Sequence, residues 1–244
     1  MGWQSKYVTE FPQFARVKRA LEIGAGGFTT AIELSNRFHD KHFHGIDFVL
    51  SDLALKNLKA APSNLTVLKH DARDLELFAE GYFDLVYSVA VMEHICELEL
   101  HLAETYRVLR PGGSYWFWQA PFWSCSLGHH YRHSKVDCPI PDYAHLHMTR
   151  DRLEMHIIEN GSTPEVAKRA VDFIYDRPDL SRMGRTDTRG IVESSPFEIA
   201  EWRDEVDSRY DPVGAARVLA NNIYNVPEED LLYKGAKVHL KKKD

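Results

Sequence analysis

Cysteine is scarce in the 244-residue sequence, and none of its cysteines lies close to another. Cys96, Cys125 and Cys138 are odd in number and form no CxxC motif. A disulfide framework needs paired cysteines, and a thiolate zinc site needs closely spaced ones. Neither feature is therefore indicated, and we expect the three thiols to be reduced and buried.

Long apolar runs and an excess of positive charge are also missing. The one charge-free stretch of membrane-spanning length, residues 111–131, is interrupted by Pro, Gly, Ser, Gln and His, which is not typical of a spanning helix. The sequence contains 30 Lys and Arg and 36 Asp and Glu, which gives a net charge of −6. This charge disfavours sequence-independent binding to the backbone of a nucleic acid. We expect neither a membrane nor a nucleic acid as a partner.

The N-terminus shows no targeting signal. No apolar leader precedes a small-residue cleavage site, and Lys6 stands where N-myristoylation requires Ser or Thr. The hydrophobic fraction of 44% and the charged fraction of 27% are those of a folded globular chain. We expect a single domain over residues 1–244, located in the cytoplasm.

Short apolar runs alternate with helix-length segments in the first half of the chain. We predict strands at residues 19–23, 43–47, 65–68, 83–89 and 114–119. Helices are predicted at residues 28–38, 51–61 and 98–109. This alternation indicates an α/β fold, doubly wound, with a mostly parallel sheet and helices on both of its faces.

Glycines and acids gather where the first three predicted strands end. The turn Gly24-Ala25-Gly26-Gly27 follows the first strand, and Glu22 lies two residues before Gly24. Asp47 closes the second strand, and Asp71-Ala72 follow the third. A glycine turn at the start of a helix brings backbone N–H groups close to a ligand. Thr29 stands where a dinucleotide-binding GxGxxG motif has its third glycine, so a nucleoside is favoured over a pyrophosphate.

These residues resemble the class I S-adenosylmethionine-dependent methyltransferases in type and order, over roughly residues 15–120. The resemblance rests on Leu21-Glu22-Ile23-Gly24-Ala25-Gly26, Asp47, Asp71-Ala72, Phe83-Asp84-Leu85-Val86, Met92-Glu93-His94 and the stretch from Arg107 to Gly113. It implies a seven-stranded sheet and S-adenosylmethionine as the cofactor.

The resemblance also assigns roles to the matched positions. It implies that Glu22, Gly24, Ala25 and Gly26 cradle the methionine end of the cofactor, that Asp47 binds the ribose hydroxyls, and that Asp71 and Ala72 receive the adenine. Phe48 and Ser88 complete the predicted cofactor site. We expect residues 1–120 to form the cofactor-binding half and residues 121–244 the substrate-binding half.

The second half predicts a sixth strand at residues 171–175 and a seventh, antiparallel in the resembling family, at residues 236–240. Helices are predicted from Thr149 or Asp151 to residue 160, and at residues 195–209, 212–224 and 227–233. We expect the insertion of about residues 176–234 to form a helical cap that covers the substrate.

Histidine is concentrated after the fifth predicted strand, where six of the 13 fall between residues 129 and 156. Imidazole accepts a hydroxyl proton near neutral pH, so candidate catalytic bases are His94, His129 and His130. The candidate substrate contacts are Trp123, Tyr131, His133, Arg182 and Arg185. The arginines form either a guanidinium clamp for phosphate or carboxylate, or a solvated loop.

A metal site is the alternative interpretation of the histidines. His130-x-x-His133 with Asp137, or His145-x-His147, has ligands that suit a divalent ion. Residues 128–141 have the Pro and Gly content of a loop, and no partner that would orient the ligands is visible in the sequence. We predict no metal.

The sequence predicts an O-methyltransferase that acts on a small, anionic, hydroxyl-bearing metabolite, such as a phosphorylated or nucleotide-linked sugar. Imidazoles outnumber the groups that a nitrogen acceptor would require. The alternatives are a quinone or lipid C-methyltransferase, which the aromatic residues from Trp116 to Trp123 would suit, and a catalytically silent cofactor-binding module. Whether the protein forms a homodimer is left open.

Overall fold

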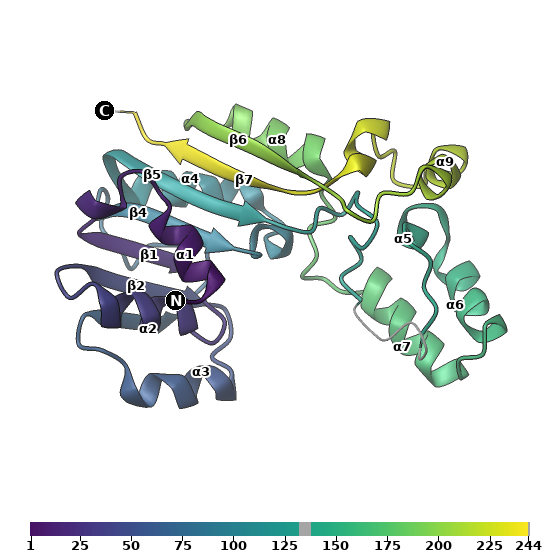
Figure 1. The fold of residues 1–244 in the computed structure, drawn as a ribbon, viewed down its shortest axis with the longest axis horizontal. Coiled ribbons are helices and arrows are strands. Elements are labelled where there is room, and N and C mark those ends of the chain that lie inside the picture. Colours follow the sequence, from purple (N-terminus) through teal and green to yellow (C-terminus); the bar gives the residue numbers. More distant parts are fainter. Residues whose placement is uncertain (132–137, 244) are drawn as a thin grey trace. The chain divides into compact units, whose positions relative to one another are not determined.

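The computed structural model describes residues 1–131 and 138–243 (Figure 1). The chain forms two compact units. The first contains residues 1–118, 190–203 and 237–244, and the second contains residues 119–189 and 204–236. The sequence placed a division at residue 120 but did not indicate that two later segments return to the first unit.

A seven-stranded sheet has the order β3-β2-β1-β4-β5-β7-β6. Its strands are β1 (Arg19–Ile23), β2 (His42–Asp47), β3 (Leu65–Lys69), β4 (Phe83–Val89), β5 (Leu109–Gln119), β6 (Glu198–Val206) and β7 (Tyr233–Lys241). All pairings among β1 to β5 are parallel, whereas the arrow of β7 runs opposite to that of β5 (Figure 1). The prediction of a doubly wound, mostly parallel sheet is confirmed.

Helices connect most of these strands and fill the second unit. They are α1 (Trp3–Thr9), α2 (Thr29–Arg37), α3 (Asp52–Asn57), α4 (Leu98–Val108), α5 (Ala144–His147), α6 (Arg150–Glu159), α7 (Pro164–Tyr175), α8 (Arg185–Ser194) and α9 (Pro212–Ala220). Short 3-10 helices lie at Phe14–Arg16, Leu58–Ala60, Met92–His94 and Glu228–Leu232. Within the described residues, none of the helices has the length and apolar character to cross a membrane.

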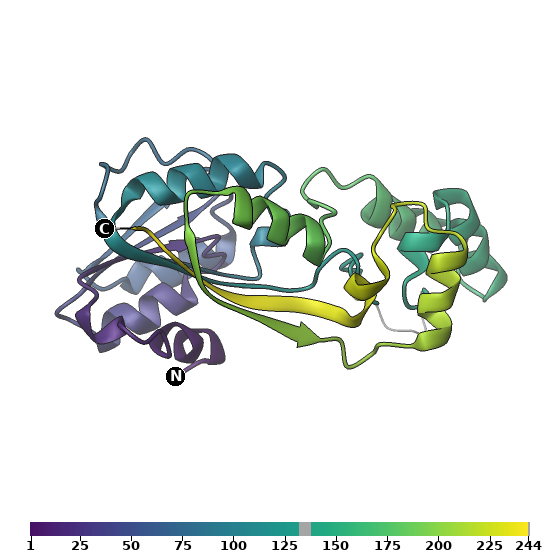
Figure 2. The same cartoon turned by 90° about the horizontal axis from the view of Figure 1, so that it is seen from above.

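Two predicted elements were wrong, and both errors arise from apolar spacing. Residues 171–175, predicted as the sixth strand, form the end of α7, which starts at a Thr163 side-chain cap with Pro164 in its first turn. Residues 195–209, predicted as a helix, contain β6, which lies at the sheet edge beside β7 (Figure 1 and Figure 2). Ile199 and Trp202 are three residues apart, which mimics helical spacing, and charged residues obscure the alternation of an edge strand.

Aromatic side chains dominate one core of the first unit. The cluster contains Tyr7, Val8, Phe11, Phe14, Val17, Ala20, Leu34, Phe43, Leu85, Tyr87 and Trp116. Tyr7 on α1 stacks on Trp116 of β5 with 5.2 Å between ring centroids, and its hydroxyl donates to the Phe117 carbonyl at 2.8 Å. Burying one such ring contributes about 1.5–3 kcal/mol, so α1 is firmly attached to the sheet.

The second unit has an apolar core of its own. It contains Trp123, Tyr131, Cys138, Tyr143, Ala144, Leu146, Leu153, Ile157, Ala167, Ala170, Val171, Ile174, Leu180, Ala215, Val218, Val226 and Leu231. Ala167, Ala170, Val171 and Ile174 recur at helical spacing on α7, and this face is buried. Thr149 caps the start of α6, as the sequence predicted.

Candidate functional site

A tight glycine turn follows β1. Gly24 and Gly26 have φ values of +65° and +53°, in the left-handed region that favours glycine. A Cβ on Gly24 would lie 2.5 Å from a methyl group of Val91, so only glycine fits there. The N–H of Ala25 donates to the Ile46 carbonyl at 3.0 Å, which ties the turn to the end of β2. The turn is therefore held in one conformation.

Asp47 ends β2 and is bonded to this turn. Its Oδ2 accepts the Gly26 N–H at 2.7 Å, and its Oδ1 accepts the Val49 N–H at 2.8 Å. Each carboxylate oxygen has a second lone pair that can accept a further hydrogen bond. Phe48, the next residue, is 67% exposed. The end of β2 thus offers an oriented carboxylate beside an accessible aromatic ring.

Glu22 lies one strand inward and is 7% exposed. Its Oε2 accepts the Ala31 N–H in the first turn of α2 at 3.0 Å, and the Tyr87 hydroxyl donates to the same oxygen at 3.4 Å. Burial raises the pKa of Glu22 to about 8. The hydrogen bonds from Ala31 and Tyr87 lower the pKa, but burial has the larger effect. At neutral pH the carboxyl is therefore mostly protonated.

The raised pKa of Glu22 predicts a pH-dependent stability that Glu22→Gln should remove. Between the ordinary pKa of 4.5 and about 8, the folded state retains a proton that the unfolded state has lost. Stability should therefore fall as pH rises through this window, by at most about 1.4 kcal/mol per pH unit. Denaturant unfolding from pH 5 to pH 9 should show this slope for the parent and not for Glu22→Gln. Exposed Glu76→Gln is the control, and equal slopes in the parent and Glu22→Gln would refute the assignment.

Asp71 follows β3 and is held by Arg73. The Nε and Nη2 atoms of Arg73 donate to its two carboxylate oxygens at 3.0 and 2.7 Å, and the Arg73 N–H donates to Oδ1 at 2.9 Å. These hydrogen bonds lower the pKa of Asp71. Arg73 also pairs with Glu97. Asp71 is thus an ionised, oriented acceptor. Its pairing with Arg73 was not predicted from the sequence.

A buried chain of hydrogen bonds supports the Ala72 loop. His101 Nδ1 donates to the Ala72 carbonyl at 2.8 Å, and its Nε2 pairs with the Tyr115 hydroxyl at 2.8 Å. The Tyr115 hydroxyl also pairs with Ser88 Oγ at 2.9 Å. Burial lowers the pKa of His101 to about 4, so the ring is neutral, and its Nε2 accepts from Tyr115.

Sequence reasoning missed His101 and Tyr115 as supports of the predicted cofactor residues Ala72 and Ser88. The available signal was the position of His101 on α4, three residues after buried Leu98 and next to buried Leu102, where a polar ring needs a partner.

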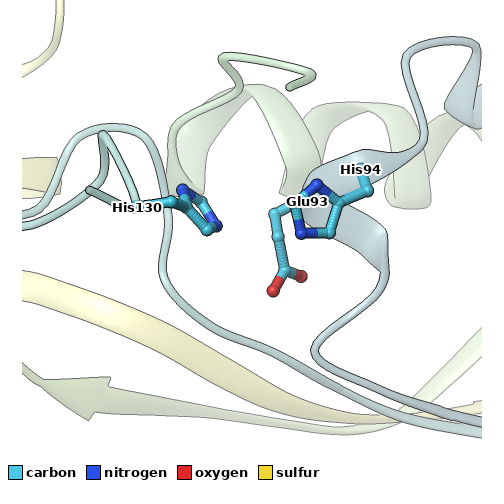
Figure 3. A group of neighbouring side chains, drawn as sticks. All are labelled: Glu93, His94 and His130. Carbon is cyan, nitrogen blue, oxygen red and sulfur yellow. The ribbon is translucent and has the colours of Figure 1, made fainter. Parts of the chain in front are cut away.

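The segment after β4 carries Glu93 and His94 on a short 3-10 helix. Figure 3 shows both side chains leaving adjacent positions of this segment. Glu93 is buried, and His94 is half-buried. Figure 3 also labels His130, which belongs to the second unit; its Nδ1 donates to the Gly128 carbonyl at 2.6 Å.

In the second unit, Trp123, His129 and Tyr131 are all buried. The fully buried ring of His145 lies against that of Trp123, with 4.5 Å between centroids, and its Nε2 donates to the Trp123 carbonyl at 2.7 Å. Burial lowers the pKa of His129 to about 3 and that of His145 well below 6.5, so both rings are neutral. His145 was not among the predicted substrate contacts, and only its place in the histidine cluster marked it.

The arginines predicted to bind the substrate are occupied within the protein. Arg185 donates from Nε and Nη2 to both carboxylate oxygens of Asp204, at 2.8 and 2.7 Å. Arg182 donates to the carbonyls of Tyr175 and Arg177 at 2.8 and 3.1 Å, with its guanidinium 5.5 Å from the Trp123 ring centre. The segment from Arg185 is helix α8 rather than a solvated loop. The guanidinium clamp was therefore wrong for Arg185, whose planar face is already matched to a carboxylate.

The alternative metal sites fall partly outside the described residues. His133 and Asp137 lie there, so the predicted substrate contact at His133 and the His130-x-x-His133 set stay predictions. In the other set, His145 Nε2 is used by the Trp123 carbonyl, and burial lowers the pKa of His147.

The comparisons with known proteins identify the first unit. A family model described as "Methyltransferase domain" matches residues 21–117. The matched segment runs from β1 into β5 and contains the glycine turn, Asp47, Asp71-Ala72, Ser88 and His94.

Two curated relatives and one solved structure show how far the similarity extends. A demethylmenaquinone methyltransferase of Thermus thermophilus is 35% identical over 39% of this chain and 44% of its own length. A fatty-acid O-methyltransferase of Mycolicibacterium smegmatis is 30% identical over 42% of this chain and 37% of its own. The alignments thus span less than half the length of either relative.

The solved structure is that of phosphoethanolamine N-methyltransferase 2 from Haemonchus contortus with S-adenosyl-L-methionine. It is 16% identical and has a TM-score of 0.59, covering 100% of this chain and 53% of that one. At this identity the likeness concerns the fold. Together with the family match and the sheet order, it supports the resemblance that the sequence shows. Residues 21–117 are similar to the methyltransferase domain family, and the chain has the fold of the S-adenosylmethionine-dependent methyltransferases.

Proposed function

We propose that this protein transfers a methyl group from S-adenosylmethionine to a hydroxyl oxygen of a small molecule. The observation that carries the choice of oxygen is the hydrogen bond from His130 Nδ1 to the Gly128 carbonyl, because it makes Nε2 the basic atom of this imidazole. A methyl sulfonium is already activated. The protein therefore has to align the acceptor and accept the hydroxyl proton, for which neutral imidazole is suited.

The geometry at the strand ends supports the proposed cofactor contacts. The unused lone pairs of Asp47 suit the two ribose hydroxyls, and Phe48 offers an exposed ring for the adenine. Glu22, whose pKa is raised to about 8 by burial, would ionise beside the cationic methionine end. Asp71 has an acceptor lone pair to spare despite Arg73 and suits an exocyclic amino group.

Hydrogen bonding narrows the set of candidate bases. His129 accepts the Tyr131 N–H at Nδ1, at 3.0 Å, so in its neutral form Nε2 carries the proton and cannot accept another. His130 donates from Nδ1, which leaves Nε2 as its basic atom. We therefore propose His94 and His130 as the bases and His129 as a donor.

The anionic part of the substrate prediction has less support. Arg182 and Arg185 are engaged with carbonyls and with Asp204. In this proposal the protein therefore recognises the hydroxyl group of the substrate rather than a phosphate or carboxylate. A quinone acceptor is the second candidate, favoured by the relative from Thermus thermophilus.

The test is methyl transfer from S-adenosylmethionine labelled in its methyl group to a small-molecule extract, with identification of the labelled product. We expect a methyl ether. Label on a ring carbon of a quinone would establish the second candidate. Cofactor binding without transfer to any acceptor, including purified quinols, would indicate a catalytically silent module.

His94→Ala should separate chemistry from cofactor binding. If His94 removes the hydroxyl proton, turnover should fall by about a hundredfold or more, while the dissociation constant for S-adenosylmethionine stays the same. Exposed His39→Ala is the control and should change neither quantity. Full activity of His94→Ala would leave His130 as the proposed base.

A further inference from the structure

The second unit contains buried ring nitrogens without a hydrogen-bond partner among the described residues, and among them are Trp123 Nε1, His129 Nε2 and His145 Nδ1. The residues are 3%, 1% and 0% exposed. An unpaired buried polar group costs about 1–3 kcal/mol. Three such groups together therefore indicate a binding partner that the polypeptide does not supply from its described part.

The three rings are neighbours, with His145 in the middle. Its ring centroid lies 4.5 Å from that of Trp123 and 5.1 Å from that of His129, and both contacts are edge-to-face. His145 comes from α5, whereas the other two residues lie on the chain after β5. Two separate segments thus bring together the three rings that carry the unpaired nitrogens.

The hydrogen bonds on the far side of each ring determine which nitrogens carry protons. His129 Nδ1 accepts the Tyr131 N–H, so Nε2 carries the proton and is a donor. His145 Nε2 donates to the Trp123 carbonyl, so Nδ1 holds a lone pair and is an acceptor. Trp123 Nε1 can only donate. The cluster therefore offers two donors and one acceptor.

This inventory is complementary to a hydroxyl group, which has one O–H to donate and two lone pairs to accept with. A carboxylate or phosphate oxygen would face the lone pair of His145, and an ammonium would face two N–H groups. A divalent metal ion would meet the proton on His129 Nε2. Of these ligands, the hydroxyl alone satisfies all three nitrogens.

We propose that Trp123, His129 and His145 form a subsite for a hydroxyl group of the substrate. The hydroxyl donates to His145 Nδ1 and accepts from His129 Nε2 and Trp123 Nε1. The inference rests on the proposed function in taking this hydroxyl to belong to the methyl acceptor. An ether oxygen has no proton to donate to His145 Nδ1, so an ether should bind in this subsite less tightly than the alcohol.

The test compares benzyl alcohol with benzyl methyl ether, which differ in the O–H donor, on the full chain without cofactor. Binding is measured by nuclear magnetic resonance, with the ring ¹⁵N signals of His129 and His145 assigned. We expect the alcohol to bind about tenfold or more tightly than the ether and to shift the His145 Nδ1 signal. Equal affinities, or no change at either ring on saturation, would overturn the subsite and leave the cluster to bound water.

Variants assign the effect to individual atoms. His145→Gln retains an amide donor for the Trp123 carbonyl but lacks the acceptor at Nδ1, so the preference for alcohol should disappear. Trp123→Phe removes a donor and should weaken alcohol and ether alike. His156→Gln, a half-buried histidine on α6, is the control. An unchanged preference in folded His145→Gln would refute the assignment.

Should His145→Gln not fold, His129→Asn replaces it. The Asn side-chain oxygen can accept the Tyr131 N–H as His129 Nδ1 does, but Asn has no donor at the position of Nε2. Binding of both probes should therefore weaken, and unchanged binding would refute the role of His129. Alcohol binding without methyl transfer to any hydroxyl would refute the proposed function alone. Methyl ether formation with no alcohol preference would refute this subsite alone.

Discussion

Asp47→Ala should weaken S-adenosylmethionine binding by about a hundredfold. The change removes the carboxylate that would accept both ribose hydroxyls, and two charge-assisted hydrogen bonds together are worth about 3 kcal/mol. Titration calorimetry on the purified protein measures the dissociation constant directly.

The control for this variant has to separate lost contacts from a loosened turn, because Asp47 also accepts the N–H groups of Gly26 and Val49. Asp47→Asn retains one oxygen acceptor without the charge and should fall between the parent and Asp47→Ala. Asp40→Ala removes an exposed carboxylate paired with Lys18 and should bind as the parent does. A parent-like dissociation constant for folded Asp47→Ala would refute the ribose assignment.

Gly128→Ala should destabilise the second unit by more than about 3 kcal/mol. A Cβ at this buried position would lie 2.1 Å from the Trp123 carbonyl oxygen and 2.6 Å from that of Phe122. Both obstacles are backbone, and the Trp123 carbonyl also accepts from His145. The backbone at Trp123 therefore has to move to make room for the Cβ. Because Trp123 belongs to the proposed hydroxyl subsite, alcohol binding should be lost together with stability.

Gly190→Ala provides the matched comparison for Gly128→Ala. Gly190 lies on α8, and a Cβ there would meet no atom within 4 Å. Alanine favours a helix over glycine by up to about 1 kcal/mol, so this variant should be as stable as the parent or more so. Denaturant unfolding measures both variants, and similar stabilities would show that the backbone around residue 128 adapts without cost.

The placement of Glu22, Asp47 and Asp71 at the carboxyl ends of the strands could be predicted because local pattern and topology agree there. β1 to β4 are short, apolar and followed by turns, and parallel pairing brings their carboxyl ends to one edge. An acid directly after such a strand therefore lies at that edge whatever its neighbours are. The pairing of Asp71 with Arg73, and the support of Ala72 by His101, depend on side-chain direction and on tertiary contact, which the spacing does not show.

The second unit was harder to predict because its elements are short and its periodicity is ambiguous. Residues 171–175 are rich in β-branched and aromatic side chains, but packing of the whole α7 face overrides this preference. Arg185 was predicted to bind the substrate because of its charge. Its partner Asp204 is 19 residues away in the sequence, so the pairing could not be read from local spacing. His145 was named as an alternative metal ligand and not as a substrate contact, because its role depends on which nitrogen carries the proton, and that is determined by the Trp123 carbonyl.

Neither unit is a contiguous piece of chain, since the backbone passes between them after residues 118, 189, 203 and 236. No single cut can therefore release either unit intact. A fragment ending at residue 118 would contain the whole matched segment 21–117 but lose β6 and β7. In the sheet order, β5 would then become an edge strand. Its unpaired N–H and C=O groups, flanked by Trp116 and Trp118, could then form hydrogen bonds with strands of other chains. The segment that carries the family likeness is thus expected to aggregate when it is produced alone.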